Sequence, residues 1–211
     1  MAPERKVSNP LALAVLALLR ERPMHPYEMA SLMRERGKHE SIKLNYGSLY
    51  TVIELLQRER FIVPRKTVRE GRRPERTVYA LTPAGRAELR DWMRELLSTP
   101  VKEYPQFEAA LSLLPVLPPE EATAQLEERA HRLEEAVARM RSGMEAARAT
   151  GLARLFLIEH EYELVLQEAE LRWVRDLVRE IKGATLSGMH EWESLHSAAS
   201  VGDADRSEED R

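Results

Sequence analysis

Apolar residues recur at helical spacing through the first sixty positions of the chain. The segment PLALAVLALLRER, which follows Asn9, is apolar nearly all round, and this pattern predicts a central core helix that ends before Pro23. Asn9 can accept hydrogen bonds from the free amides of the first turn, and Pro10 suits the first helical position. A shorter amphipathic helix is predicted from His25 to a stop at Gly37. Its apolar side is expected to hold Tyr27 or Met29, together with Leu32 and Met33.

A third helix is predicted in NYGSLYTVIELLQRERF, where Asn45 can cap the first turn. One face carries the apolar residues Leu49, Val52, Ile53 and Leu56, which we expect to be buried. The opposite face carries Ser48, Thr51 and Leu55, with Tyr46 and Gly47 at the leading turn. Apart from Glu54, this face is largely free of acids. Small, hydrogen-bonding side chains of this kind are typical of a helix that lies in a DNA major groove.

Two β-branched and aromatic runs follow, FIVPRKTV and RTVYALT, separated by REGRRPE. A Gly and a Pro in the connection predict a hairpin, and the connection is longer than a two-residue turn, so its tip should project. Thr82 and Pro83 then mark the start of another helix, TPAGRAELRDWMRELL. Three helices, a two-stranded wing and a helix are the order of a winged helix-turn-helix domain, which we expect over residues 9–98.

The second half predicts long helices. Prolines interrupt residues 99–118, which read as a linker with a short helix at QFEAALSLL. Pro119 then opens a long helix, and steps of four and three along it predict an a/d seam. The seam consists of Leu126, Ala130, Leu133, Val137, Met140, Met144 and Ala147. After a turn at Thr150 and Gly151, a second helix is predicted from Leu152 to Ile181.

This second helix carries two apolar lines. The first is Leu155, Ile158, Tyr162, Val165, Ala169 and Trp173, and the second is Leu171, Val174, Leu177, Val178 and Ile181. One helical hairpin cannot bury so much apolar surface, so residues 119–182 are predicted to be an antiparallel dimerisation domain. The alternative is a bundle within one chain, packed against the winged helix. Residues 183–211 lose periodicity, and roughly the last ten of them are expected to be disordered.

Composition excludes several kinds of site. The chain has 211 residues and no cysteine, so disulfides, thiolate metal sites and cysteine nucleophiles are excluded. The longest apolar run, from Leu11 to Leu19, is 9 residues, whereas a membrane span needs about 20. Together with the lack of a signal-peptide pattern, this favours a cytoplasmic protein without a membrane partner.

The net charge of −3 hides a division along the chain. Residues 1–100 hold 19 basic against 12 acidic residues, and the remainder hold 13 against 23. A basic first half predicts contact with a polyanion. The predicted wing concentrates Lys66, Arg69, Arg72, Arg73 and Arg76, side chains suited to phosphates.

Catalytic and metal motifs are not evident. The six histidines are scattered, and His160-Glu161 has no second histidine four residues on, so it does not form the HExxH zinc pattern. His190 and His196 fall in a segment whose sequence gives little support for a firm helix. No GxGxxG, GxxxxGKS or GxSxG occurs. We therefore expect neither an enzyme nor a bound metal or cofactor.

The run YGSLYTVIELLQRERFI, the basic hairpin and VYALTPAGRAEL together resemble the PadR family of bacterial transcriptional regulators. The resemblance covers residues 9–98, and the helical remainder is similar to the C-terminal dimerisation region of longer members. It implies a homodimeric regulator, usually a repressor, that binds an inverted-repeat operator in double-stranded DNA and is released by a small molecule. The alternative function is a helical interaction module whose winged helix binds a protein.

The resemblance also implies roles for single residues. Base-facing roles fall to Tyr46, Ser48 and Thr51, and phosphate contacts to Lys43 and Asn45. Tyr50 would contact the DNA backbone or pack at the junction of helix and wing. Trp92 and Trp173, with Phe107, Phe156 and Tyr162, could line a cavity between the two halves for a small aromatic effector; core packing is the alternative for Trp92.

Overall fold

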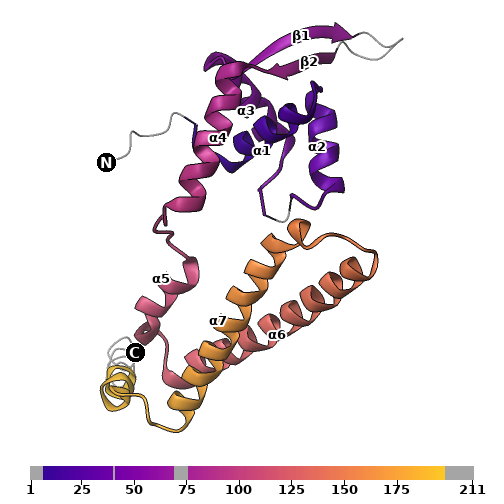
Figure 1. Ribbon diagram of the computed structural model, residues 1–211. Helices are drawn as coiled ribbons and strands as arrows, with labels where there is room; N and C mark the ends of the chain where they lie inside the picture. Colours follow the sequence, from indigo (N-terminus) through magenta and orange to yellow (C-terminus); the bar gives the residue numbers. More distant parts are fainter. Residues whose placement is uncertain (1–6, 40, 69–75, 198–211) are drawn as a thin grey trace, which may run out of the picture. The chain divides into compact units, whose positions relative to one another are not determined.

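The computed structural model describes residues 7–39, 41–68 and 76–197 (Figure 1). The chain divides into two compact units, residues 1–102 and 103–211. The first contains α1 (Pro10–Glu21), α2 (Pro26–Glu35), α3 (Tyr46–Arg58), β1 (Ile62–Val68), β2 (Arg76–Leu81) and α4 (Pro83–Ser98). The second contains α5 (Gln106–Ser112), η1 (Leu114–Val116), α6 (Pro119–Ala149), η2 (Arg154–Phe156) and α7 (Ile158–Lys182). The predicted fold class, mainly helical with one antiparallel hairpin, is confirmed.

The helices of the first unit begin at the capping residues that the sequence marks. Asn9 Oδ1 accepts from the Leu11 amide at 2.9 Å, and Asn45 Oδ1 accepts from the Ser48 amide at 2.7 Å. His25 Nδ1 accepts from the third amide of α2 at 3.0 Å, and Thr82 Oγ1 does the same for α4 at 3.0 Å. Each cap satisfies an amide that has no partner within its helix, which fixes where the helix begins.

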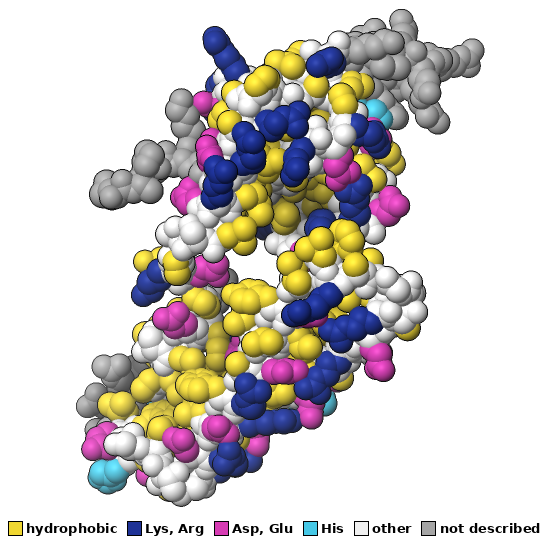
Figure 2. All heavy atoms as spheres, in the orientation of Figure 1, with side chains coloured by type: hydrophobic (Ala, Val, Ile, Leu, Met, Phe, Trp, Pro, Cys, Tyr) yellow, Lys and Arg dark blue, Asp and Glu magenta, His cyan; other side chains and the backbone are white. Residues whose placement is uncertain are grey.

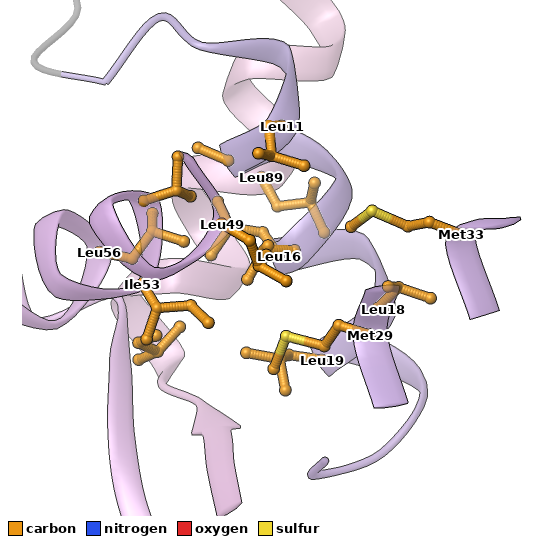
Figure 3. Packing of buried hydrophobic residues seen from close by; sticks show 14 of the residues in the cluster. Leu11, Leu16, Leu18, Leu19, Met29, Met33, Leu49, Ile53, Leu56 and Leu89 are labelled. Carbon is orange, nitrogen blue, oxygen red and sulfur yellow. The ribbon is translucent and has the colours of Figure 1, made fainter. Parts of the chain in front are cut away.

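The core of the first unit surrounds α1. Figure 3 shows Leu49 and Ile53 of α3 pointing towards Leu16 of α1, with Met29 and Met33 contributed by α2. These residues are at most 2% exposed. Because α1 is apolar nearly all round, it can bury side chains against α2, α3 and α4 at once. The core thus holds α3 by one face and leaves its other face outward.

The hairpin is tied to the helical core at its base. β1 and β2 are antiparallel, with Ile62 opposite Leu81, and the register shifts between Pro64 and Lys66. Proline cannot donate to a ladder, and a bulge is one of the places where a strand accepts it. At the base, the main chain of Tyr79 exchanges hydrogen bonds of 3.0 and 3.2 Å with Met24, between α1 and α2. This short bridge attaches β2 to the helices.

In the second unit, α6 and α7 pair in an antiparallel arrangement. Ion pairs cross between them at Glu127–Lys182 (2.5 Å), Glu134–Arg175 (2.7 Å), Arg141–Glu168 (2.7 Å) and Arg148–Glu161 (3.1 Å). As the numbers on α6 rise, those on α7 fall by the same steps, so all four pairs specify one register. The apolar seam between the helices includes Leu126 and Ala130 of α6 with Leu171 and Val174 of α7.

One expectation about the second long helix is corrected. It begins at Ile158 rather than Leu152, because residues 154–156 form the separate turn η2. Of its two apolar lines, the second packs against α6, and the first is left outward, since Leu155, Ile158, Tyr162, Val165 and Trp173 are 48–69% exposed. The face that α7 turns to α6 also includes Glu161 and Glu168, which pair there with arginines.

A further helical stretch covers residues 189–197 and was not predicted. Trp192 is 5% exposed, and its indole nitrogen donates to the Leu117 carbonyl at 2.8 Å. His196 Nε2 lies 2.9 Å from the Pro115 carbonyl oxygen. The segment lacks a long apolar period because a few side chains, chiefly one buried indole, attach it to the rest of the unit.

Candidate nucleic-acid interface

The outward face of α3 is the first element of the candidate interface. Leu49, Val52, Ile53 and Leu56 are at most 3% exposed, as predicted. The helix consequently presents Tyr46 (42% exposed), Tyr50 (53%) and Thr51 to solvent, with Ser48 half-buried between them. The structure therefore gathers the predicted base-facing residues on one exposed surface.

Hydrogen bonds at the start of α3 decide which atoms of Thr51 and of the capping residue Asn45 remain for a ligand. Thr51 Oγ1 donates to the Gly47 carbonyl at 3.1 Å, which uses its one proton. Towards DNA, Thr51 can therefore act as an acceptor. Asn45 uses its side-chain oxygen in the helix cap, so its amide group is the part that can donate to a phosphate oxygen.

Tyr46 is held by side chains from α2. The Arg34 Nη1 donates to the Tyr46 hydroxyl at 2.9 Å, and the guanidinium carbon lies 4.8 Å from the centre of the Tyr46 ring. The ring of Tyr27 stacks beside it at a centroid distance of 6.4 Å and an interplanar angle of 12°. The sequence allowed either Tyr27 or Met29 on the apolar side of α2. Tyr27 is 57% exposed, so Met29 is the residue that lies in the core.

Tyr50 lies near the base of the wing. Burial raises the pKa of the Tyr79 phenol above its usual range, with smaller contributions from the charges of Glu54 and Tyr50. These groups are therefore close in space, on α3 and β2. Because Tyr50 itself is 53% exposed, much of its ring is open to a ligand rather than packed at the junction.

The basic residues around α3 extend this surface. Lys43, just before α3, is exposed, as is Arg65 on β1. Lys66 and Arg76 lie on β1 and β2, where the backbone is described but their side chains are not. The predicted contacts Arg69, Arg72 and Arg73 lie outside the described residues. On the face shown in Figure 2, dark-blue side chains are present on the unit that carries the hairpin and also on the unit of α6 and α7.

Three members of this surface escaped the sequence prediction: Tyr27, Arg34 and Arg65. Tyr27 and Arg34 lie on α2, and only the fold brings them to Tyr46. A signal was present for Arg65, because it is part of the basic run that enters the wing.

The two tryptophans predicted to line a ligand cavity lie in different units. Trp92 is 4% exposed and belongs to the core of the first unit, which agrees with core packing, the alternative given for this residue. Trp173 is 48% exposed and lines a groove of about 830 Å³ in the second unit, between α5, α6 and α7. In this groove its ring meets Phe107 edge-to-face at 6.3 Å, and the Arg129 guanidinium lies 3.6 Å from the Phe107 ring centre. Glu170 holds Arg129 through a hydrogen bond of 2.6 Å.

The described residues were also compared with the requirements of a metal site and of a membrane-spanning helix. Across residues 7–39, 41–68 and 76–197, no three His, Asp or Glu side chains are grouped so that they could hold a metal ion. Within the same residues, no helix has the length and apolar character to cross a membrane.

Comparisons with known proteins agree with this geometry. Residues 15–91 match the model of the "Transcriptional regulator PadR-like family". The "Negative transcriptional regulator PadR" of Bacillus subtilis (strain 168) is 34% identical over 84 residues, which are 39% of this chain and 44% of that protein. The alignment with this curated relative thus spans less than half of its length.

Solved structures extend the likeness beyond the aligned segment. Bacillus subtilis PadR in complex with operator DNA is 20% identical, covers 82% of this chain and 99% of that one, and gives a TM-score of 0.66. Its complex with p-coumaric acid gives 0.66 at 19% identity, over 82% and 98% of the chains. The Vibrio cholerae virulence activator AphA gives 0.61 at 20% identity, over 82% and 99%. At such identities the structures show the fold.

The PadR resemblance is confirmed over residues 15–91 by the family model, which describes transcriptional regulators. The fold, a winged helix with a helical second unit, is confirmed by the solved structures.

Proposed function

We propose that this chain is a PadR-like, sequence-specific DNA-binding regulator that represses transcription. In this proposal a homodimer binds an inverted-repeat operator, with α3 in the major groove and the basic wing on the phosphate backbone. The observation that carries the proposal is the outward face of α3, where Tyr46, Tyr50 and Thr51 are exposed beside the hairpin. The relative from Bacillus subtilis is named a negative regulator and has been solved with operator DNA, which supports repression and DNA as the partner.

The surface has the two components that DNA binding needs. Hydrogen-bonding side chains at base edges supply specificity, and the proposal gives this role to Tyr46, Ser48 and Thr51. Cations and amides at phosphates supply affinity. That role is proposed for Lys43, Asn45 and Tyr50 around α3, and for Lys66, Arg69, Arg72, Arg73 and Arg76 in the wing.

The direct test is selection of genomic DNA fragments by the purified protein, followed by titration of the best-enriched duplex. We expect an inverted repeat whose half-sites lie roughly 34 Å apart, one helical turn. Affinity should fall steeply with salt, because each neutralised phosphate releases counterions. A protein that enriches no duplex, or one whose binding is insensitive to salt, would favour the alternative of a protein-interaction module.

Homodimerisation is proposed from the exposed side of α7. Its stripe consists of Leu155, Ile158, Tyr162 and Val165, which begin at η2 and continue along α7. Figure 2 shows hydrophobic side chains running along this helix. A water-exposed stripe of this length is typical of a surface that another protein covers. On α6, Leu126 and Leu133 belong to the apolar cluster shared with α7 of the same chain, and Val137 and Met144 are buried, so the proposed dimer contact is assigned to α7.

The dimer is tested by measuring mass in solution. Tyr162→Glu and Val165→Glu should each convert the dimer to a monomer, because a carboxylate would be buried in an apolar interface. Ala138→Glu is the matched control, since Ala138 is exposed on α6 and lies outside the stripe. Unchanged mass for both stripe variants would show that the dimer uses another surface.

A small aromatic effector is proposed for the groove at Trp173. The groove offers an aromatic ring pair for stacking and the Arg129–Glu170 ion pair for polar contact, and a relative has been solved with p-coumaric acid. A panel of aromatic acids and amines should include one that quenches Trp173 fluorescence and releases the selected duplex. Trp173→Leu should abolish both effects, whereas Trp192→Phe should retain them. Release that persists in Trp173→Leu would place the effector elsewhere.

A further inference from the structure

The helix α2 packs against α3 and also contributes side chains to the exposed surface. Its Arg34 donates to the Tyr46 hydroxyl at 2.9 Å, and its Tyr27 ring lies parallel to the Tyr46 ring within 12°. Tyr46 is the first residue of α3. Tyr27 and Arg34 are seven positions apart and therefore lie on one side of α2. Both contact the side chain of Tyr46.

The contacts of Tyr27 and Arg34 with Tyr46 lie outside the buried core. Tyr27 and Tyr46 are 57% and 42% exposed, and Arg34 is exposed as well. Two neighbouring arginines pair with carboxylates, Arg22 with Glu28 and Arg36 with Glu21. Arg34 instead donates to the phenol oxygen of Tyr46 on α3. An exposed aromatic stack with an arginine on it is better explained by a ligand that meets it than by stability alone.

The direction of the hydrogen bond defines that ligand. A phenol has one proton, and in this contact the Tyr46 oxygen accepts from Arg34 because a guanidinium can only donate. The Tyr46 proton is not used in this contact, so the hydroxyl can donate it to another group, which must be an acceptor.

We propose that Arg34 is a positioning residue that fixes Tyr46 as a hydrogen-bond donor to an acceptor on DNA, with Tyr27 bracing the ring. The acceptor is a phosphate oxygen or an acceptor on a base edge, such as O6 or N7 of guanine. An amino group of cytosine or adenine does not fit. This inference rests on the proposed function and adds α2 to the DNA surface.

The test is a double-mutant cycle on the best-enriched duplex, with Tyr46→Phe, Arg34→Ala and the double variant. We expect each single change to weaken binding about tenfold, the usual scale for one hydrogen bond to a charged or well-placed acceptor. The double variant should be no weaker than the weaker single variant, because Arg34 acts through the Tyr46 hydroxyl. The slope of affinity against salt should not change when Arg34→Ala is added to Tyr46→Phe.

Duplex variants separate the two acceptors. A loss in Tyr46→Phe that is equal for all duplexes indicates a phosphate, whereas a loss confined to one base position indicates a base edge. Tyr104→Phe and Arg94→Ala serve as controls, since both residues are exposed and lie outside the proposed interface. Thermal unfolding of each variant checks that the fold is retained.

Two outcomes would overturn the inference while leaving the proposed function in place. One is full affinity in Tyr46→Phe or in Arg34→Ala. The other is a multiplied loss in the double variant with a lower salt slope, which would mean that Arg34 contacts a phosphate itself. A wild-type protein that enriches no duplex would instead overturn the proposed function, and this inference with it.

Discussion

The carbonyl oxygen of Phe61 lies where Gly85 would need to place a β-carbon. A β-carbon built on Gly85 would be 2.1 Å from that oxygen, far inside van der Waals contact. The same oxygen accepts a hydrogen bond from the amide of Thr82 at 3.0 Å, and the Thr82 hydroxyl can donate either to it, at 3.0 Å, or to the Arg60 carbonyl oxygen, at 2.8 Å. Thr82 and Gly85 thus join the first turn of α4 to the segment between α3 and β1. This contact gives a physical reason for the Thr-x-x-Gly step in the sequence.

Gly85→Ala should therefore destabilise the first unit. The obstacle is a backbone atom that cannot rotate away, so we expect a loss of about 3 kcal/mol in the free energy of unfolding, the upper range for overpacked sites. Urea unfolding followed by the fluorescence of Trp92 measures it. Gly143→Ala is the matched control, because its β-carbon meets nothing within 4 Å. In α6 that change should stabilise by about 0.5–1 kcal/mol. Equal stability of Gly85→Ala and the wild type would contradict the close contact.

Asn45 combines a helix cap with a proposed phosphate contact, and two substitutions separate these roles. Asn45→Asp keeps the cap oxygen and should retain stability, yet its negative charge should lower affinity for every duplex. Asn45→Ala loses the cap and should cost about 1 kcal/mol of stability. Thermal unfolding and duplex titration of both variants give the comparison. Undiminished binding by Asn45→Asp would remove Asn45 from the interface.

Thr51 is expected to read a donor on a base edge, because its proton is used by the Gly47 carbonyl. Thr51→Ser should keep most of the sequence preference, whereas Thr51→Val keeps the shape and should lose the preference at one base position by about 1–3 kcal/mol. The measurement is binding to a set of single-base operator variants. An identical preference profile for Thr51→Val and wild type would count against a base-facing Thr51.

The wing is expected to contribute affinity without sequence preference. Changing Arg72, Arg73 and Arg76 to Ala should weaken binding to all duplexes and lower the salt slope by about 0.9 for each phosphate that the variant no longer neutralises. A matched triple variant of the second unit, Arg132, Arg139 and Arg172 to Ala, should leave both quantities unchanged. If the wing variant keeps its affinity, the wing does not meet DNA.

The ion pair at the far end of α6 and α7 predicts a pH dependence. The hydrogen bond from Arg154, with a second from Arg148, holds the pKa of Glu161 below its ordinary 4.5. A carboxyl whose pKa falls on folding stabilises the fold above its unfolded pKa, and this stabilisation is lost as the pH falls through the folded pKa. Glu161→Gln should therefore lower Tm at pH 7, and the difference from wild type should vanish as the pH falls below 4.5. A difference that persists in acid would assign it to packing.

The sequence predicted most where the signal is local. Asn9, Asn45 and Thr82 each lie within three residues of the amide that they cap, so the starts of α1, α3 and α4 followed from short motifs. The buried face of α3 followed from helical spacing. The outward face of α3, and with it the first part of the candidate site, could be derived in the same way.

Contacts between distant segments could not be predicted in this way. Charged side chains on the inner side of α7, Glu161 and Glu168, interrupt its apolar period, and their partners are on another helix. The Arg34–Tyr46 bond depends on how α2 and α3 cross, which neither helix specifies alone. Trp192 is attached to Leu117, 75 positions earlier in the chain, and no pattern near either residue indicates the other.

The chain's 3 tryptophans occupy three different environments. Trp92 is enclosed in the first unit, Trp173 lines an open groove, and the indole of Trp192 is bonded to a main-chain carbonyl. Variants that each retain a single tryptophan would thus give separate optical signals. One would follow melting of the winged helix, one would follow ligands entering the groove, and one would follow release of the last helix. The molecule carries its own probes for ordering these events in time, without an added dye.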